Sequence, residues 1–329
     1  GTGWALADLA LHTRRLPSVP LPGFFTPGQI GHALDDAGVD AVLTDDPRRA
    51  RELLPGWLVA GTSGRSGLAL FRRQLDAATR PVLPPGTAKI TYTSGSTGQP
   101  KGVYYSHRST YLHAMAIALA GEISFRDAYY QLVPMFHAMG WGTPYAAVAA
   151  GAKFVLPGMY NIFDLGSLAE PLVSERVTVT AGAPALLMPM LEYIRKLERK
   201  PDLSGARFLC GASEPSLTLM QGFKELTGAE IIHAYGATET SPLVSGNRLL
   251  PWLEQELSAA EQWDLKRKQG LPVVGLDVKV VDPLGRELPH DGKSAGEILI
   301  RGPWITGAYH DAPGSVRRVR EIRTGPRRW

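Results

Sequence analysis

The sequence predicts an α/β fold built on parallel sheets that helices cover, followed by a smaller antiparallel β-rich unit. Short apolar runs rich in β-branched residues alternate with helix-length segments through the middle of the chain, which is the pattern of βαβ units. After Asn247 the pattern changes to alternating strands joined by a turn. The 329 residues are 44% hydrophobic and 20% charged, an ordinary globular composition that is large enough for a substantial core.

The N-terminal part is expected to deliver a strand into a conspicuous polar loop. A Pro/Gly loop at Pro81–Gly86 precedes this strand, and Pro and Gly are the strongest local breakers of regular structure. The elements expected here are helices at Ala5–Leu11 and Gln29–Ala37 and strands at Ala41–Thr44 and Lys89–Thr93.

The middle of the chain is expected to supply the parallel sheet and its covering helices. Ser109 is a candidate N-cap, and Gly151 is a candidate stop for the helix before it. The expected helices are Ser109–Ala120, Thr143–Ala150, one within Phe163–Arg176, Pro184–Leu197 and Leu217–Leu226. The expected strands are Gln131–Pro134, Lys153–Leu156, Val177–Thr180, Phe208–Cys210 and Glu230–His233.

The region after Asn247 is expected to hold a helix and then an antiparallel strand pair. Ser258 and Glu261 form a capping-box pattern, and Gly270 is a candidate helix stop. The strands are expected at residues 275–281 and 296–301, with a turn at 282–285. We therefore predict a core over residues 1–247, a helix plus β-rich subdomain over 248–310, and an abnormal Arg-rich tail over 311–329.

Composition excludes several classes of protein. The single cysteine, Cys210, excludes an internal disulfide and is typical of a reducing, cytoplasmic location. Its setting at a strand end predicts a buried core thiol. The longest apolar stretch, residues 145–156, is interrupted by Gly151 and Lys153 and is too short for a transmembrane segment. The first eleven residues lack the basic start and long apolar run of a signal peptide.

The net charge of +4 comes from the C-terminal tail. Residues 314–329 carry six arginines against Glu321 alone. A basic tail can indicate nucleic-acid affinity. However, this tail has no interleaved aromatic residues and no nucleic-acid-binding motif before it, so we predict no nucleic-acid partner. Salt-sensitive nucleic-acid binding through the tail remains the weaker alternative.

The loop after the Lys89–Thr93 strand is the most informative part of the chain. Residues 92–103 read Tyr-Thr-Ser-Gly-Ser-Thr-Gly-Gln-Pro-Lys-Gly-Val. Such a loop can offer several backbone N–H groups, several hydroxyls and one cation to the same anion. Its glycines keep side chains out of the way and allow positive φ. The loop therefore predicts a polyphosphate site.

This loop is not the P-loop of the nucleoside triphosphatases, since Pro100 stands where that motif needs its second glycine. The loop instead resembles the signature of the adenylate-forming (AMP-binding) enzymes, which include acyl-CoA synthetases, adenylation domains and luciferases. The resemblance implies two parallel-sheet α/β subdomains plus a smaller antiparallel unit. It also assigns the ATP triphosphate to the loop residues Thr93, Ser94, Gly95, Ser96, Thr97, Gly98 and Lys101.

A second motif supports the resemblance. Residues 235–242, which follow a predicted strand, read Tyr-Gly-Ala-Thr-Glu-Thr-Ser-Pro, similar to the family's second core motif. The resemblance implies that Tyr235, Gly236 and Thr238 contact the nucleotide. It also implies that Glu239, with Thr97, holds Mg²⁺, an ion that takes oxygen ligands and often only one or two carboxylates.

Two further segments resemble the family's substrate side. Residues 133–141 read Val-Pro-Met-Phe-His-Ala-Met-Gly-Trp, similar to a proline–aromatic–histidine motif at the carboxylate site. We expect Phe136, Met139 and Trp141 to line an apolar acyl pocket and His137 to lie near the carboxylate. Residues 210–215 resemble a Gly-rich loop where adenine and acyl chain meet, which places the backbone of Gly211 and Ala212 close to the ligand.

The likeness is greatest to medium- and long-chain fatty acyl-CoA synthetases and covers roughly residues 20–310. The resemblance implies ATP, Mg²⁺ and CoA as cofactors, a fatty carboxylic acid as substrate, and catalytic roles for Lys101, His137, Thr238 and Glu239. Pro326 stands where the family has an Asp after Arg-Thr-Gly. We therefore expect a truncated large domain without the C-terminal lid and with impaired turnover.

Alternative functions remain open on the sequence. One is an aryl- or amino-acid-adenylating domain, and another is a non-catalytic nucleotide- or acyl-binding fragment or pseudoenzyme. The sequence leaves open the acyl chain length and the oligomeric state, which includes a homodimer.

Overall fold

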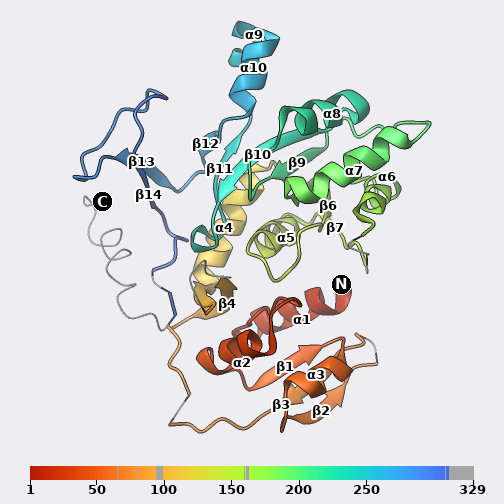
Figure 1. The fold of residues 1–329 in the computed structure, drawn as a ribbon, viewed down its shortest axis with the longest axis vertical. Helices are drawn as coiled ribbons and strands as arrows, with labels where there is room; N and C mark the ends of the chain where they lie inside the picture. Colours follow the sequence, from red (N-terminus) through yellow and green to blue (C-terminus); the bar gives the residue numbers. More distant parts are fainter. Residues whose placement is uncertain are drawn as a thin grey trace. The chain divides into compact units, whose positions relative to one another are not determined.

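The computed structural model describes residues 1–64, 66–78, 80–93, 99–158, 160, 163–307 and 309–310. The chain divides into two compact units, which we describe separately (Figure 1). The first unit is Gly1–Arg108 with the described residues of 306–310, and the second is Ser109–Ile305. The Arg-rich tail at 311–329 lies outside the described residues, and the domain boundary that we place at Asn247 stays a prediction.

The first unit contains two small antiparallel sheets. One sheet has the order β1-β3-β2, and the other pairs β4 with β5. Thr26 and Gln29 form a reciprocal capping box that starts α2. The elements are α1 Thr2–Thr13, α2 Pro27–Asp36, β1 Ala41–Thr44, α3 Pro47–Leu53, β2 Leu58–Thr62, β3 Ala69–Arg72, β4 Thr87–Thr93 and β5 Lys101–Ser106.

A buried ion pair ties α1 to β4. The Lys89 ammonium bonds the Asp8 carboxylate, and their side chains are only 2% and 6% exposed. Ser18 Oγ donates to the same carboxylate at 3.1 Å, and the Lys89 ammonium lies 5.1 Å from the centre of the Trp4 ring. Burial lowers the pKa of Lys89, against the opposing effect of Asp8. Removing either charge would therefore leave the other one buried without its partner.

The second unit is built on a seven-stranded sheet with the order β12-β11-β10-β9-β8-β6-β7. The neighbouring strands from β10 to β7 pair in parallel. Strand β11 pairs antiparallel with both of its neighbours, β10 and β12. The elements around the sheet core are α4 His107–Ala120, β6 Ala128–Tyr130, α5 Met139–Ala150, β7 Lys153–Val155, the 3₁₀ helix η1 Leu165–Ala169, α6 Glu170–Ser174, β8 Val179–Gly182, α7 Pro184–Lys196, β9 Arg207–Cys210, α8 Leu217–Thr227 and β10 Glu230–Gly236.

The remaining elements are the 3₁₀ helix η2 Thr238–Thr240, β11 Leu243–Asn247, α9 Pro251–Glu256, α10 Ala259–Lys266, β12 Leu271–Pro272, β13 Asp277–Val281 and β14 Glu297–Arg301. The β13–β14 pair is antiparallel, as predicted. The capping box of Ser258 and Glu261 starts α10, as predicted.

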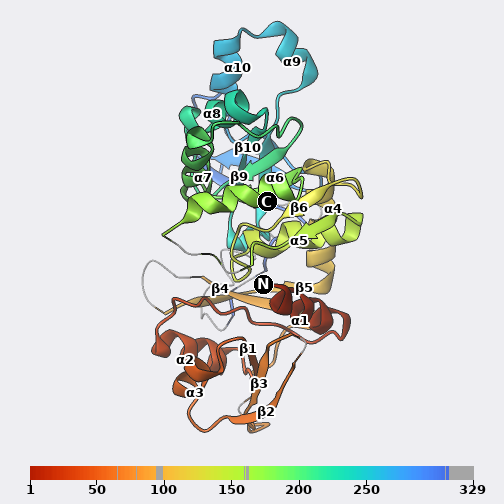
Figure 2. The ribbon, with the colours of Figure 1, turned by 90° about the vertical axis from the view of Figure 1, so that its right-hand side faces the viewer.

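Helices cover both faces of the seven-stranded sheet (Figure 2). Successive side chains along β9 and β10 point to opposite faces of the sheet and so contribute to two separate cores. Phe208 and Ile231 pack with α7 and α8, whereas Leu209 and Ile232 pack with α4 and α5. This arrangement confirms the predicted α/β fold class with a mainly parallel sheet and smaller antiparallel units. The sheet of residues 41–72 is antiparallel. In the described part of the chain, the parallel strand pairs lie in the second unit, and the first unit has one isolated parallel bridge between Ser18 and Lys89.

Three local predictions are wrong. Residues 131–134 leave the sheet after β6, and the Gln131 side chain donates to the carbonyl of Val133 at 2.5 Å. Ser109 lies inside α4, which starts at His107. Gly270 does not stop α10, because the helix ends at Lys266, where Asn247 Nδ2 donates to the Leu265 carbonyl at 2.6 Å. A long-range side chain thus caps this helix in place of a glycine.

His113 is a buried histidine that should make stability depend on pH. It is 1% exposed, and its Nε2 accepts a hydrogen bond of 3.2 Å from the Leu243 N–H. Burial lowers the pKa of His113 from 6.5 to about 3. Between these two pH values the unfolded chain binds more protons than the folded chain, so stability falls as pH falls.

We expect His113 to cost about 1.4 kcal/mol of folding stability per pH unit below pH ~6.5. Urea unfolding at pH 7.5 and at pH 5.5 measures this slope in the wild type and in His113→Gln. The variant should show a shallower pH dependence, whatever its stability at pH 7.5. Equal slopes in the two proteins would contradict the assignment.

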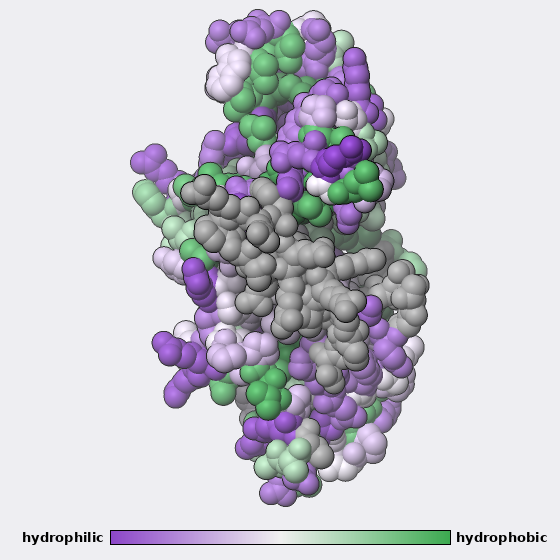
Figure 3. Space-filling model, turned by 90° about the vertical axis from the view of Figure 1, so that its left-hand side faces the viewer, coloured by the Kyte–Doolittle hydropathy of each residue, from purple (hydrophilic) through white to green (hydrophobic). Residues whose placement is uncertain are grey.

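The surface mixes polar and apolar side chains (Figure 3). Among the described residues, no helix combines the length and the apolar character needed to span a bilayer.

Candidate functional site

The signature loop connects β4 to β5 in the first unit. Thr93 and Lys101 face each other as the last and first residues of the paired strands, and Thr93 Oγ1 donates to the Lys101 carbonyl at 3.4 Å. The predicted phosphate-binding residues between them, Ser94–Gly98, lie outside the described residues. The hairpin therefore holds the two described ends of the loop at one edge of this sheet.

Lys101 is exposed, with its ammonium 5.6 Å from the centre of the Tyr309 ring. Next to it, His32 Nε2 lies 3.0 Å from the carbonyl oxygen of Pro100. A carbonyl oxygen only accepts, so Nε2 donates. The base of the loop is thus fixed by the first unit, while the Lys101 side chain can reach an anion.

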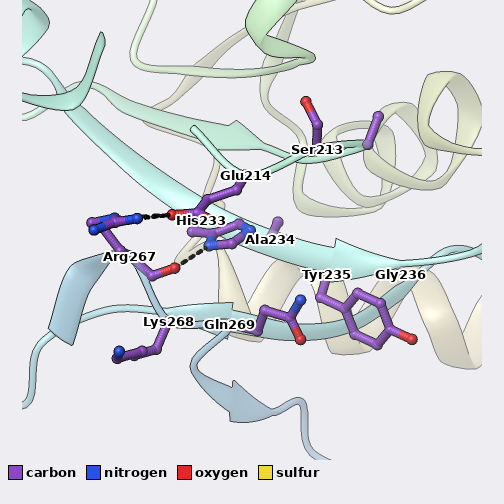
Figure 4. A pocket seen from close by; sticks show the side chains of 10 residues that line it. Ser213, Glu214, His233, Ala234, Tyr235, Gly236, Arg267, Lys268 and Gln269 are labelled. Carbon is purple, nitrogen blue, oxygen red and sulfur yellow. Dashed lines mark hydrogen bonds and ion pairs between the residues drawn. The ribbon is translucent and has the colours of Figure 1, made fainter. Parts of the chain in front are cut away.

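The second unit contains a pocket of about 550 Å³ at the carboxyl ends of β9 and β10 (Figure 4). Ligands of open α/β sheets bind at this end of parallel strands. The pocket combines the loop after β9, the end of β10 and the segment after α10. Its lining residues are Ala212, Ser213, Glu214, His233, Ala234, Tyr235, Gly236, Arg267, Lys268 and Gln269.

The loop after β9 approaches the neighbouring chain closely. A Cβ atom at Gly211 would lie 2.8 Å from the Ala234 carbonyl oxygen and 3.4 Å from Met139 Cε. Ala212 has φ of +69°, a left-handed conformation that costs a non-glycine residue energy and often marks functional sites. Gly211, Ala212 and Met139, which we predicted from separate motifs, therefore lie together. Burial raises the pKa of Cys210 to about 12, in agreement with a core thiol.

The turn after β10 carries Thr238 and Glu239, both half-buried in η2. The buried Thr240 holds this turn, because its hydroxyl accepts from the Ala237 N–H at 2.9 Å and also contacts the Pro242 carbonyl. Sequence reasoning missed Thr240, although it lies within the quoted motif. Its neighbour Gly236 is packed so tightly that a Cβ atom would lie 2.0 Å from the Pro242 carbonyl oxygen.

Among the described residues, no three or more His, Cys, Asp or Glu side chains form a metal cluster. A Mg²⁺ ion held by one carboxylate and by substrate phosphates does not need such a cluster. Glu239, half-buried in a turn at the rim of the sheet, fits this type of coordination. Thr97, the other predicted metal residue, lies outside the described residues.

The segment before α5 forms a tight turn. The His137 N–H donates to the Pro134 carbonyl at 3.0 Å, and His137 Nδ1 accepts from the Met139 N–H at 3.2 Å. The neutral ring therefore carries its proton on Nε2. His137 is exposed as a residue, but the protein around its ring excludes part of the solvent, and this desolvation lowers the pKa of His137. Trp141 is buried, at 1% exposure, and its ring centre lies 6.2 Å from that of Tyr145, whereas Phe136 is half-buried.

Seven of the ten pocket residues were missed as site candidates, and three of these interact directly with one another: Glu214, His233 and Arg267. Arg267 forms an ion pair with Glu214 at 2.8 Å, and its carbonyl accepts a hydrogen bond of 2.8 Å from His233 Nδ1. Glu214 lies within the 210–215 segment that we quoted for the resemblance, and Arg267 lies in the segment after α10. No local pattern in those segments indicates that the two side chains meet.

The chain is similar in sequence to known proteins of one family. The sequence profile of the AMP-binding enzyme family matches residues 1–310. A long-chain-fatty-acid–CoA ligase of Thermus thermophilus is 37% identical over 305 residues, which is 89% of this chain and 55% of that protein. A medium-chain-fatty-acid–CoA ligase of Ectopseudomonas oleovorans is 40% identical over 232 residues, 70% of this chain and 42% of that protein. The chain spans about half the length of these relatives.

Solved structures share the fold. A long-chain-fatty-acid–CoA ligase from Archaeoglobus fulgidus superposes with a TM-score of 0.72 at 23% identity, covering 94% of this chain and 63% of that one. The o-succinylbenzoate CoA synthetase of Bacillus subtilis, in complex with its acyl-adenylate intermediate, has a TM-score of 0.71 at 21% identity, covering 97% and 77%. With the family profile matching nearly the whole described chain, this protein belongs to the AMP-binding enzyme family.

Proposed function

We propose that this chain forms the nucleotide- and acyl-binding part of an ATP-dependent fatty acid–CoA ligase. In that reaction a carboxylate oxygen attacks the α-phosphorus of ATP and pyrophosphate leaves. The CoA thiol then attacks the acyl carbon, which yields acyl-CoA and AMP. The observation that carries the proposal is the pocket at the ends of β9 and β10, which gathers Ala212, Tyr235 and Gly236 in one place.

Each predicted residue has a role in this proposal. Tyr235, Gly236 and Thr238 contact the nucleotide, and Gly211 and Ala212 present their backbone to it. Lys101 and the 93–98 loop bind the triphosphate. Glu239 holds Mg²⁺ with Thr97, and the ion offsets negative charge on the phosphates.

The acyl side of the proposal rests on the turn before α5. The half-buried Phe136 and Met139 supply apolar surface, whereas Trp141 is buried at 1% exposure and offers no free surface. The approach of Met139 to Gly211 joins this turn to the loop after β9. His137 has its Nε2–H available as a neutral donor to a carboxylate or acyl-phosphate oxygen. The fatty-acid–CoA ligase relatives favour an aliphatic carboxylate as the substrate.

Thermal stabilisation by non-hydrolysable acyl-adenylate mimics tests the proposal. Mimics with alkyl chains of increasing length and with an aromatic acyl group are compared in Mg²⁺. At a hundredfold excess over Kd, a bound mimic should add about 2.7 kcal/mol of stability. A shift that grows with alkyl length supports a fatty acid, and a shift only from the aromatic mimic supports an aryl acid. A cooperative unfolding transition that no mimic shifts would contradict the proposal.

Replacing Lys101 with alanine should weaken ATP binding about tenfold or more, since a hydrogen bond to a charged group contributes about 1.5–3 kcal/mol. Binding of an acyl-adenylate mimic, which lacks the β- and γ-phosphates, should change much less. Calorimetric titration of both ligands measures the two effects. Lys293→Ala, at an exposed position of the β13–β14 connection, is the control. Equal losses for both ligands would contradict a triphosphate role.

A further inference from the structure

Arg267 connects the three walls of the candidate nucleotide pocket. Its Nε and Nη2 bond Glu214 Oε1 at 2.9 and 2.8 Å, which reaches the loop after β9 (Figure 4). Its carbonyl oxygen accepts from His233 Nδ1 at 2.8 Å, which reaches strand β10. The residue itself belongs to the third wall, the segment after α10. One residue therefore contacts all three walls of the pocket.

The third wall is anchored to the sheet by buried side chains. Asn247 Nδ2 donates to the carbonyls of Leu265 and Lys268, both at 2.6 Å, and Ser245 Oγ donates to the Gln269 carbonyl at 2.6 Å. Ser245, Asn247 and His233 are 5–7% exposed. Buried hydrogen bonds of this kind are costly to break, so this wall has a fixed position on the sheet.

The position of the loop after β9 depends more on the Arg267–Glu214 ion pair than the position of the third wall does. It carries Ala212 in the left-handed region, and its Glu214 meets Arg267 across the pocket. We propose that Arg267 is a positioning residue, which holds this loop at the distance that a nucleotide requires. The inference rests on the proposed function of the pocket. An already ordered pocket loses less entropy on binding, and so binds more tightly.

The pair is suited to a test because it contributes little to folding. The Arg267 and Glu214 side chains are 44% and 52% exposed, and exposed ion pairs contribute about 0–1 kcal/mol. Breaking the pair should therefore change ligand affinity without a comparable loss of stability. If the pair had only a structural role, breaking it would lower stability more than it lowers ligand affinity.

The experiment is calorimetric titration of the full chain with AMP and with adenosine, alongside thermal unfolding. Glu214→Gln and Arg267→Gln should each weaken both ligands about two- to fivefold, the fold-change that corresponds to 0.5–1 kcal/mol. The double variant Glu214→Arg with Arg267→Glu should recover most of the affinity. Arg301→Gln, which breaks the Asp277 pair of 2.7 Å on β13–β14, is the matched control and should bind as the wild type does.

The outcomes separate this inference from its rivals. If Arg267 only attracts the phosphate, Glu214→Gln should tighten AMP binding and leave adenosine unchanged, which overturns the positioning role. Wild-type affinity in both single variants also overturns it and leaves the proposed function intact. Lost affinity with a lowered Tm that the charge swap does not restore means a structural role and overturns it. Failure of the wild type to bind either ligand overturns both proposals.

Discussion

Asp8→Ala should destabilise the protein by about 3–5 kcal/mol, the loss expected when one partner of a buried ion pair is removed. The variant leaves the Lys89 ammonium buried without its carboxylate, and Ser18 loses its acceptor. The measurement is the free energy of unfolding from urea titration followed by circular dichroism. This is the largest effect of a single substitution that we expect on the folding of the first unit.

Two further variants test the physical reason. Asp8→Leu combined with Lys89→Met replaces both charges by apolar groups and should cost much less than Asp8→Ala, because no charge is left buried. Glu175→Ala breaks the exposed Lys153–Glu175 pair, whose side chains are 54% and 44% exposed, and should cost at most about 1 kcal/mol. A loss in Asp8→Ala no larger than that in Glu175→Ala would contradict the buried pair.

Gly236→Ala should abolish nucleotide binding and destabilise the second unit by about 1–3 kcal/mol, as overpacking does. The added Cβ would lie 2.0 Å from the Pro242 carbonyl oxygen and 2.7 Å from its carbon. These are backbone atoms that cannot rotate away. The turn between them carries Thr238 and Glu239, so the residues that we propose for nucleotide and Mg²⁺ binding would move with it. Titration with AMP and thermal unfolding measure both losses.

Gly246→Ala is the matched control on the adjacent strand β11. There the nearest atom to an added Cβ is Ile232 Cγ2, at 4.0 Å. We expect AMP affinity near the wild-type value and a stability change within about 0.5 kcal/mol. Normal AMP binding in Gly236→Ala would show that the close contact with Pro242 does not shape the site.

The sequence by itself determined the family, the fold class and most of the regular elements of the second unit. The signature motif at residues 92–103, the Tyr235–Pro242 motif and the β–α alternation are local patterns, in which neighbouring residues report directly on backbone conformation. Strand β2 of the first unit was missed because it lacks such a local pattern. All five residues of β2 are exposed, so the alternation that reveals a half-buried strand is absent there.

Tertiary structure alone decided which distant side chains meet. Glu214 and Arg267 are 53 residues apart, Asp8 and Lys89 are 81 apart, and His113 and Leu243 are 130 apart. Residue preferences and hydrophobic periodicity act over a few residues, whereas these contacts depend on the path of the whole chain between them. The end of α10 also could not be predicted from local pattern. Asn247, from strand β11, caps this helix, whereas the local pattern had assigned the helix stop to Gly270.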